Sequence, residues 1–132
     1  MSDLRVGLLG AGWFGREAHL KNLLQLEGVR VVAASSRSAA SLDAVRAIAG
    51  EDMHLARDWR EIVDDDQVDA VIIALTNDQH HPAALAALAA GKHVLCEKPL
   101  GLSLTECDEI IAAAESADRV LQVGHEMRFQ QL

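Results

Sequence analysis

Short apolar runs alternate with longer amphipathic stretches along the whole chain. The runs are flanked by turn-forming residues and predict buried strands at residues 4–9, 29–34, 53–56, 68–75, 93–96 and 120–123. The stretches between them predict helices over 13–26, from Ser38 or Ser41 to Ile48, after Asp58, from Pro82 to Gly91 and after Ser103. Strands that alternate with helices form parallel sheets through right-handed crossovers. The pattern therefore predicts an α/β fold, a doubly wound parallel sheet of about six strands with helices on both faces.

Capping residues mark the starts of the later helices. Asp58 with Glu61, and Ser103 with Glu106, have the spacing of a capping box, in which two side chains satisfy the first backbone N–H groups of a helix. Proline is favoured in the first turn because its missing N–H would have no partner there. Pro82 therefore fits the start of an Ala/Leu-rich helix.

Length and composition indicate one domain without a polyanionic partner. The chain has 132 residues and no linker or repeat that would divide it, so residues 1–132 are expected to form a single domain. A formal net charge of -8 disfavours nucleic acid and anionic membranes as partners. The first apolar run is too short for a secretory signal or a membrane span, which predicts a cytoplasmic protein. The histidines and the two cysteines lack metal-ligand spacing, so no metal site is expected.

Gly10, Gly12 and Gly15 form a G-x-G-x-x-G motif, with Trp13 and Phe14 inside it, between the first predicted strand and the first predicted helix. In this place the first glycine allows a tight turn, the second lets the backbone approach a pyrophosphate, and the third lets helix and strand pack closely. The helix N-terminus adds N–H donors for phosphate. The motif predicts a Rossmann-type dinucleotide site, and the competing interpretation is a glycine-rich turn without a ligand.

The residues after the second predicted strand indicate which dinucleotide binds. NAD-binding domains usually have an acid there for the ribose 2′-hydroxyl, whereas this chain has Ser35, Ser36, Arg37 and Ser38. A guanidinium beside hydroxyls suits a 2′-phosphate, so the predicted cofactor is NADP, with NAD as the alternative. In the competing interpretation, Ser38 only caps the next helix and Arg37 is solvated.

Glu97, Lys98 and Pro99 follow the strand predicted at 93–96, at the sheet edge where doubly wound proteins bind ligands. Lys98 can hydrogen-bond a substrate hydroxyl or carbonyl there and change its proton affinity, while Glu97 can orient Lys98 or hold a ribose. By composition alone, a surface lysine before a loop proline is the simpler interpretation. Cys96 is expected to be a buried small hydrophobe rather than a nucleophile.

Several ordered motifs together make the chain similar to the N-terminal domain of the Gfo/Idh/MocA-like oxidoreductases. The motifs extend over nearly all 132 residues: the glycine motif, Asp69 to Ala74 leading into Asn77 and His80, Gly91-Lys92-His93-Val94, Glu97-Lys98-Pro99, Val123-Gly124-His125 and Arg128-Phe129. The resemblance implies that pyrophosphate binds at the glycine motif and that Lys98 lies at the reaction centre. It also implies cofactor contacts from six residues: Ser36, Arg37, Asn77, His80, Glu97 and Lys98 itself.

The resemblance implies hydride transfer between NADP or NAD and a sugar, cyclitol or related small molecule, in a full-length protein able to form homo-oligomers. Family enzymes continue into a second domain that binds substrate. Because the chain ends before such a domain, it is expected to be inactive alone. Two local departures from the family pattern are Thr76, where many relatives have proline, and His19, one place beyond a commonly seen histidine.

Two other functions remain open from the sequence. A nicotinamide-binding module without catalysis, acting as a sensor or partner-binding protein, explains the short chain, whereas the presence of Glu97, Lys98 and Pro99 favours an enzyme. An S-adenosylmethionine or flavin protein of the same fold explains the glycines but leaves the Glu-Lys-Pro segment unexplained.

Overall fold

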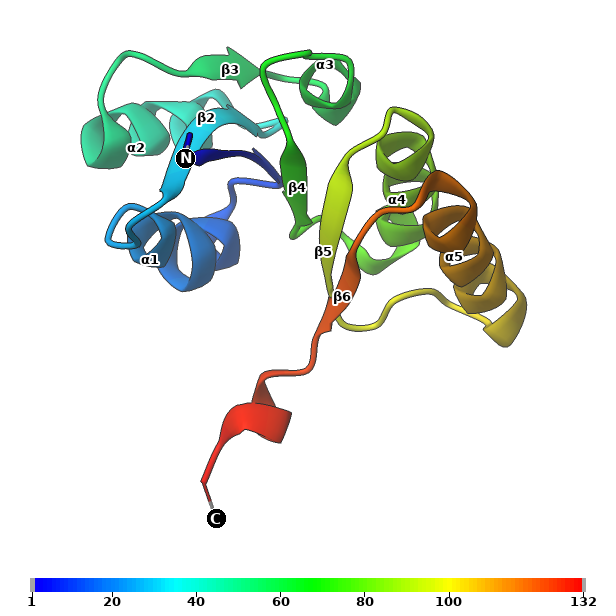
Figure 1. Ribbon diagram of the computed structural model, residues 1–132. Coiled ribbons are helices and arrows are strands. Elements are labelled where there is room, and N and C mark those ends of the chain that lie inside the picture. Colours follow the sequence, from blue (N-terminus) through cyan, green and yellow to red (C-terminus); the bar gives the residue numbers. More distant parts are fainter. Residues whose placement is uncertain (1, 132) are drawn as a thin grey trace.

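The computed structural model describes residues 2–131, and its centre is one six-stranded sheet (Figure 1). The strands are β1 (Leu4–Leu9), β2 (Val29–Ser35), β3 (His54–Ala56), β4 (Ala70–Ile73), β5 (His93–Glu97) and β6 (Leu121–Gly124). They lie in the order β3-β2-β1-β4-β5-β6, and all neighbouring pairs are parallel. The parallel sheet predicted from the sequence is confirmed.

Helices cover both faces of this sheet. The first helix consists of a π-helical segment, η1 (Gly15–Leu20), and α1 (Lys21–Leu23); the others are α2 (Ala39–Ala49), α3 (Trp59–Val63), α4 (His80–Ala89), α5 (Leu104–Ala117) and the 3-10 segments η2 (Asn77–Gln79) and η3 (Glu126–Phe129). One core cluster joins α3, α4 and α5 to one face, and a second joins the first helix and α2 to the other. Figure 1 shows α4 and α5 beside β5 and α1 and α2 beside β2. The fold is therefore doubly wound.

Successive side chains of β5 point alternately into the two core clusters. Val94 and Cys96 are buried in the cluster that contains α4 and α5, whereas Leu95 packs against the cluster of the first helix. Because successive side chains of a strand point to opposite faces, Glu97 lies on the same face as Leu95. The acid of the Glu-Lys-Pro segment is thus directed toward the helix that follows the glycine motif.

The order of the strands reverses beside β1. This strand pairs with β2 on one side and with β4 on the other. In open α/β sheets such a reversal leaves a crevice outside the carboxyl ends of the strands, because the connections on either side leave toward opposite faces. The loops after β1 and β4 therefore border the candidate site.

The predicted helix starts agree with the structure. The side chains of Ser38, Asp58 and Ser103 each accept a hydrogen bond from a backbone N–H in the first turn of their helices, at 3.2, 2.9 and 3.1 Å. Pro82 lies in the first turn of α4. These caps satisfy N–H groups that have no partner within the helix, which fixes where each helix begins.

Two predicted elements are too long. The helix predicted over 13–26 ends at Leu23, and part of it is π-helical rather than α-helical. Leu24 and Leu26 are 45% and 55% exposed, so the core does not support another turn, and the amides of Gln25 and Leu26 bond three residues back and tighten the helix end. The strand predicted over 68–75 is only four residues long, although Val68 is still buried.

After β6 the chain leaves the sheet. The segment η3 projects away from the sheet and its helices in Figure 1, and Met127 and Phe129 on it are each 76% exposed. This segment therefore adds little to either core. Across residues 2–131, none of the helices has the length and apolar composition needed to cross a membrane.

Candidate functional site

The three glycines of the motif have different surroundings. A Cβ on Gly10, whose φ is +95°, would lie 2.4 Å from the carbonyl oxygen of Ala74, and a Cβ on Gly15 would lie 2.2 Å from that of Gly10. Both glycines are therefore required by the packing of the chain itself. A Cβ on Gly12 would meet nothing within 4 Å. The close packing of this protein does not explain Gly12, whereas a ligand backed against its Cα would.

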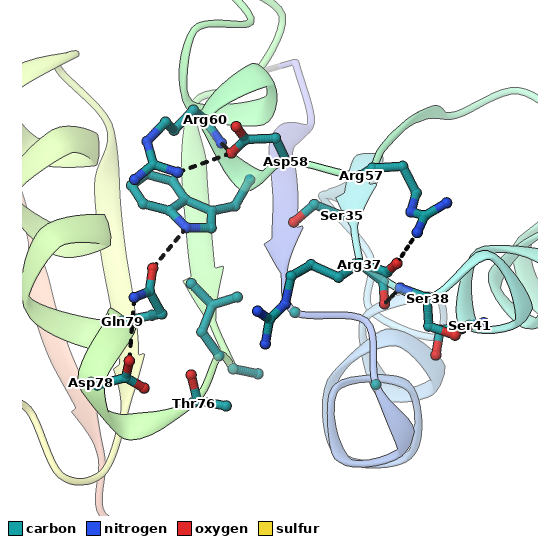
Figure 2. A pocket seen from close by; sticks show the side chains of 16 residues that line it. Ser35, Arg37, Ser38, Ser41, Arg57, Asp58, Arg60, Thr76, Asp78 and Gln79 are labelled. Carbon is teal, nitrogen blue, oxygen red and sulfur yellow. Dashed lines mark hydrogen bonds and ion pairs between the residues drawn. The ribbon is translucent and has the colours of Figure 1, made fainter.

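A cleft of about 670 Å³ opens beside Gly10 and Gly12, at the carboxyl ends of β1, β2 and β4. Figure 2 shows that its walls come from segments far apart in the sequence, which follow different strands. Its lining includes two residues predicted to select the cofactor, Ser36 and Arg37. Further polar side chains, which were not among the predicted cofactor contacts, also line it: Ser35, Ser38, Ser41, Arg57, Asp58, Arg60, Thr76, Asp78 and Gln79.

Ser35 ends β2 with an unpaired hydroxyl. The residue is 1% exposed, and no partner for its Oγ lies within residues 2–131. Its backbone oxygen, in contrast, accepts hydrogen bonds from the amides of Gly10 and Ala11, at 3.2 and 2.7 Å. A buried polar atom without a partner costs free energy, so an unpaired hydroxyl in a cleft points to a group supplied from outside.

Three arginines give the cleft its charge. The Arg37 side chain extends into the cleft in Figure 2, and within residues 2–131 no hydrogen bond or ion pair engages its guanidinium. Arg57 donates to the backbone oxygen of Arg37 and so supports this loop. The Arg60 guanidinium already has partners within the chain. It pairs with the Asp58 carboxylate at 3.2 Å, and its Cζ lies 4.4 Å from the centroid of the Trp59 ring. Arg37 is therefore the cation most available to an anionic ligand.

Asp58 and Asp78 are the two acids that line the cleft. The backbone N–H of Arg60 at the start of α3 lowers the pKa of Asp58. Hydrogen bonds from Thr76 and Gln79, and more weakly the charge of Arg37, lower the pKa of Asp78. Three arginines against two aspartates leave the cleft with a net positive charge.

The serine and arginine segment combines a helix cap with an arginine that lines the cleft. Ser38 is the N-cap of α2, as the competing interpretation expects. Its neighbour Arg37 is exposed but lines the cleft rather than pointing away from it. Ser36 is half-buried and its Oγ accepts from the Ser38 amide at 3.2 Å. The cap thus positions the loop that carries Arg37.

A second group of predicted residues lies at the end of β5. Glu97 is 8% exposed and its Oε1 is 2.8 Å from Nε2 of His19 on η1, a contact that the sequence analysis missed. Lys98 is exposed. The signal that could have found this contact is the face alternation of β5, which places Glu97 under the first helix.

The remaining predicted residues differ in their access to a ligand. Trp13 is 71% exposed and Phe14 44% exposed. Asn77 is exposed on η2, whereas His80 is 1% exposed and its ring nitrogens lie 2.6 Å from the Pro99 oxygen and 3.1 Å from the Leu75 oxygen. His80 therefore joins the loops after β4 and β5, and its ring does not face the cleft.

The cysteines and the metal-capable side chains show no reactive arrangement. Burial raises the pKa of the Cys96 thiol to about 12, so the thiolate needed for nucleophilic chemistry is not available at neutral pH. Within residues 2–131, His, Cys, Asp and Glu side chains form no group of three or more that could hold a metal ion.

Comparison with known proteins identifies the family. The model of the Gfo/Idh/MocA oxidoreductase family, NAD-binding Rossmann fold, matches residues 4–125. Inositol 2-dehydrogenase of Klebsiella pneumoniae is 37% identical over 124 residues, which cover 92% of this chain and 36% of that protein. The structure of scyllo-inositol dehydrogenase from Lactobacillus casei with bound NAD(H) and scyllo-inositol matches with a TM-score of 0.89 and 26% identity, over 98% of this chain and 38% of that one.

Biliverdin reductase from Synechocystis, in complex with biliverdin and NADP+, matches with a TM-score of 0.87 and 27% identity, over 96% of this chain and 39% of that one. The chain thus spans a little more than a third of the length of these relatives. One similar structure holds NAD(H) and another NADP+, so the likeness alone does not select the cofactor. The family match covers nearly the whole chain, and the strand order and glycine motif agree with it: this chain belongs to the Gfo/Idh/MocA oxidoreductase family, as an NAD-binding Rossmann domain.

Proposed function

We propose that this chain is the cofactor-binding domain of an NADP-preferring oxidoreductase that transfers a hydride to or from a sugar, a cyclitol or a related hydroxy or carbonyl compound. The observation that carries the proposal is the contrast within the glycine motif. Gly10 and Gly15 are demanded by the packing of the chain, whereas Gly12 faces open space beside the cleft. The names of the relatives, inositol dehydrogenases among them, support the substrate class.

The residues around the cleft fit a dinucleotide. Gly12 and the start of the first helix would hold the pyrophosphate, because backbone N–H groups at a helix N-terminus favour phosphate. The unpaired Ser35 hydroxyl lies at the end of β2, where the adenosine ribose would lie in a Rossmann domain. Trp13 and Phe14, both exposed, would border the cofactor between Gly12 and Gly15.

The preference for NADP rests on charge. No carboxylate follows β2 to accept hydrogen bonds from a ribose 2′-hydroxyl, and Arg37 with Ser36 stands there instead. The Arg37 guanidinium is unengaged by other side chains of residues 2–131 and extends into the cleft (Figure 2). Arg57 holds the backbone of Arg37 and adds a second positive charge beside it. A 2′-phosphate would satisfy both groups with charge-assisted hydrogen bonds.

The reacting end of the site would be formed by the Glu-Lys-Pro segment. When bound, the nicotinamide supplies or accepts the hydride. Lys98, exposed at the end of β5, would hydrogen-bond the substrate oxygen and hold or release the proton at Nζ. Glu97 would fix the end of β5 next to Lys98. His80, whose ring nitrogens lie against the oxygens of Leu75 and Pro99, would hold the two neighbouring loops. Asn77 is exposed beside them and available to the cofactor.

The test is calorimetric titration of the chain with NADPH and NADH, together with an Arg37→Ala variant. The unaltered chain is expected to bind NADPH at least about tenfold more tightly than NADH, which corresponds to one charge-assisted interaction with the 2′-phosphate. The Arg37→Ala variant is expected to lose this difference. The melting temperature should not change, because no other side chain engages the guanidinium.

An Arg30→Ala variant is the matched control. Arg30 is an exposed arginine on β2, at the other end of the strand from the cleft. It should bind both cofactors like the unaltered chain. Equal affinity for NADPH and NADH in the unaltered chain would contradict the phosphate preference, and binding of neither would contradict the proposed function.

A further inference from the structure

His19 and Glu97 form a buried pair between two segments that the sequence separates widely. His19 Nε2 lies 2.8 Å from Glu97 Oε1, and the two side chains are 15% and 10% exposed. An ionised carboxylate has only acceptor sites, so the imidazole is the donor of this bond. A polar group this deeply buried needs a hydrogen-bond partner. Within residues 2–131, His19 is the side chain that supplies it.

Three segments meet at the Glu97 carboxylate. Glu97 ends β5, His19 lies on η1, and Gly124 ends the neighbouring strand β6. A Cβ on Gly124 would lie 2.9 Å from Glu97 Oε2 and 3.0 Å from Oε1, so the carboxylate rests directly on the glycine. The carboxylate is therefore held from two sides, by a donor and by a close surface.

His19 is itself connected to the glycine motif. The ring of Phe14 packs edge-to-face against the imidazole, with ring centroids 5.7 Å apart and an interplanar angle of 79°. Between these two residues the helix is π-helical, a wide turn that often marks functional positions. A contiguous chain of contacts thus runs from Phe14 through His19 to the residue that precedes Lys98.

The order of the strands gives this chain of contacts a place along a bound dinucleotide. The cleft with Arg37 lies at the ends of β2, β1 and β4, and β5 follows β4 in the sheet. A dinucleotide with its phosphates at Arg37 and Gly12 would extend its nicotinamide toward the end of β5. His19 and Glu97 lie at that end, away from the adenosine.

We infer that His19 is a positioning residue for the nicotinamide end of the site: its hydrogen bond holds Glu97, and thereby the segment of Lys98, in register with the glycine motif. The inference rests on the proposed function. Without His19, the carboxylate loses its donor and is expected to move toward water, which shifts the end of β5. The adenosine half of the site, which does not touch this pair, is expected to stay unchanged.

The test uses two probes that share the 2′-phosphate and the pyrophosphate. NADPH carries the nicotinamide, whereas 2′-phospho-ADP-ribose lacks it. A His19→Leu variant is expected to bind NADPH about tenfold more weakly, because the displaced end of β5 no longer positions the nicotinamide. It should bind 2′-phospho-ADP-ribose within about twofold of the unaltered chain. The fluorescence change of the reduced nicotinamide on binding should decrease in parallel.

Three further variants separate positioning from folding. His19→Gln keeps an N–H donor and should restore most of the NADPH affinity and fluorescence. Gly124→Ala keeps His19 but pushes the carboxylate away, so it should reproduce the selective loss of NADPH binding. His54→Leu removes a comparable histidine from an exposed 2.7 Å pair with Asp65 and should leave both probes unaffected.

The other outcomes of these binding experiments contradict either the role of His19 or the proposed function. If His19→Leu weakens the binding of both probes equally, or changes the binding of neither, the inference is overturned while the proposed function stands. Failure of the unaltered chain to bind either probe would overturn the proposed function and the inference with it. A selective effect that His19→Gln does not restore would show that the hydrogen bond is not the cause.

Discussion

The two ends of the sheet both carry charged residues beside a cavity of similar size, about 670 Å³ at the carboxyl end and about 590 Å³ at the amino end. At the amino end, Arg5 donates to both carboxylate oxygens of Asp69, at 2.8 and 3.0 Å. Lys92 is 7% exposed, and its Nζ donates to the backbone oxygens of Asp65 and Val68, at 2.7 Å each. The chain itself satisfies these charges.

The carboxyl end differs in what is left unsatisfied. The Ser35 hydroxyl has no partner within residues 2–131, and Gly12 faces open space. The two ends are therefore distinguished not by the size of their cavities but by whether their polar groups have hydrogen-bond partners within the chain. Groups satisfied by the chain are expected to affect stability, and groups left free are expected to affect binding.

The largest effect is expected within the glycine motif. Gly15→Ala places a Cβ against the Gly10 carbonyl oxygen, in backbone that cannot move aside easily, and should lower the free energy of unfolding by about 3 kcal/mol or more. Gly12→Ala should change it by less than about 0.5 kcal/mol, because the added methyl meets no atom of the chain. Urea unfolding measures both values.

The same pair of variants should behave oppositely in cofactor binding. Gly12→Ala is expected to weaken NADPH binding by at least about tenfold while it remains folded, because the methyl would occupy the place of the pyrophosphate. Unchanged affinity in Gly12→Ala would show that this open face is not a ligand surface.

Lys92 provides the next largest effect, on stability alone. Lys92→Met keeps the aliphatic stem but removes the ammonium. The buried Val68 oxygen then loses this donor, and the Asp65 oxygen keeps only the Val68 amide. The free energy of unfolding should fall by about 2 kcal/mol, the range for hydrogen bonds from a charged group. NADPH affinity, measured by calorimetry, should stay within about twofold. If Lys92→Met kept its stability but bound NADPH more weakly, the amino end of the sheet would act in binding, contrary to the comparison of the two ends.

Asp69 allows a pH test of the amino end. Hydrogen bonds from the Arg5 side chain and amide lower the pKa of Asp69 from 3.8 to about 2. Because the folded pKa is lowered, this stabilisation is fully present above pH 4 and is lost as the pH falls through 2. Solvent screens a pair whose side chains are 35% and 34% exposed, so the loss should be about 1 kcal/mol.

Asp69→Asn should remove that part of the pH dependence. Urea unfolding at pH 7 and pH 2.5 compares the two chains. The variant should be less stable at pH 7 by about 1 kcal/mol, and the difference should fall to less than about half of this at the lower pH. A difference that persists unchanged at low pH would mean that the ionised carboxylate is not what stabilises this end.

The smallest effect is expected from Arg57 at the carboxyl end. Arg57→Ala removes the donor to the Arg37 backbone oxygen and one positive charge of the cleft. NADPH binding should weaken about threefold and NADH binding should not change, because an exposed charge acts through solvent. A parallel loss for both cofactors in calorimetry would place Arg57 at a part of the ligand that they share.

The regular elements could be predicted because their signals are local. Capping at Ser38, Asp58 and Ser103 and the period of the apolar runs depend only on neighbouring residues. The end of the first helix could not, since Leu24 and Leu26 look apolar enough to continue it. Their exposure follows from which atoms the sheet presents to them, a property of the tertiary structure.

The candidate site was predictable along each segment but not across segments. The glycine motif and Arg37 follow from their position after β1 and β2. The contributions of Arg57 and Asp78, and the contact between His19 and Glu97, depend on how separate segments come together. His80 shows the converse: its place in a motif suggested cofactor contact, but its ring nitrogens face the backbone oxygens of two loops.

The most direct test of the contrast between the two ends is NMR chemical-shift mapping of the backbone amides during titration with NADPH. Shifts are expected at Gly10 to Gly15, at Ser35 to Arg37 and near Glu97, and none at Arg5, Asp69 or Lys92. Shifts concentrated at the amino end, or no shifts at saturating NADPH, would contradict this contrast.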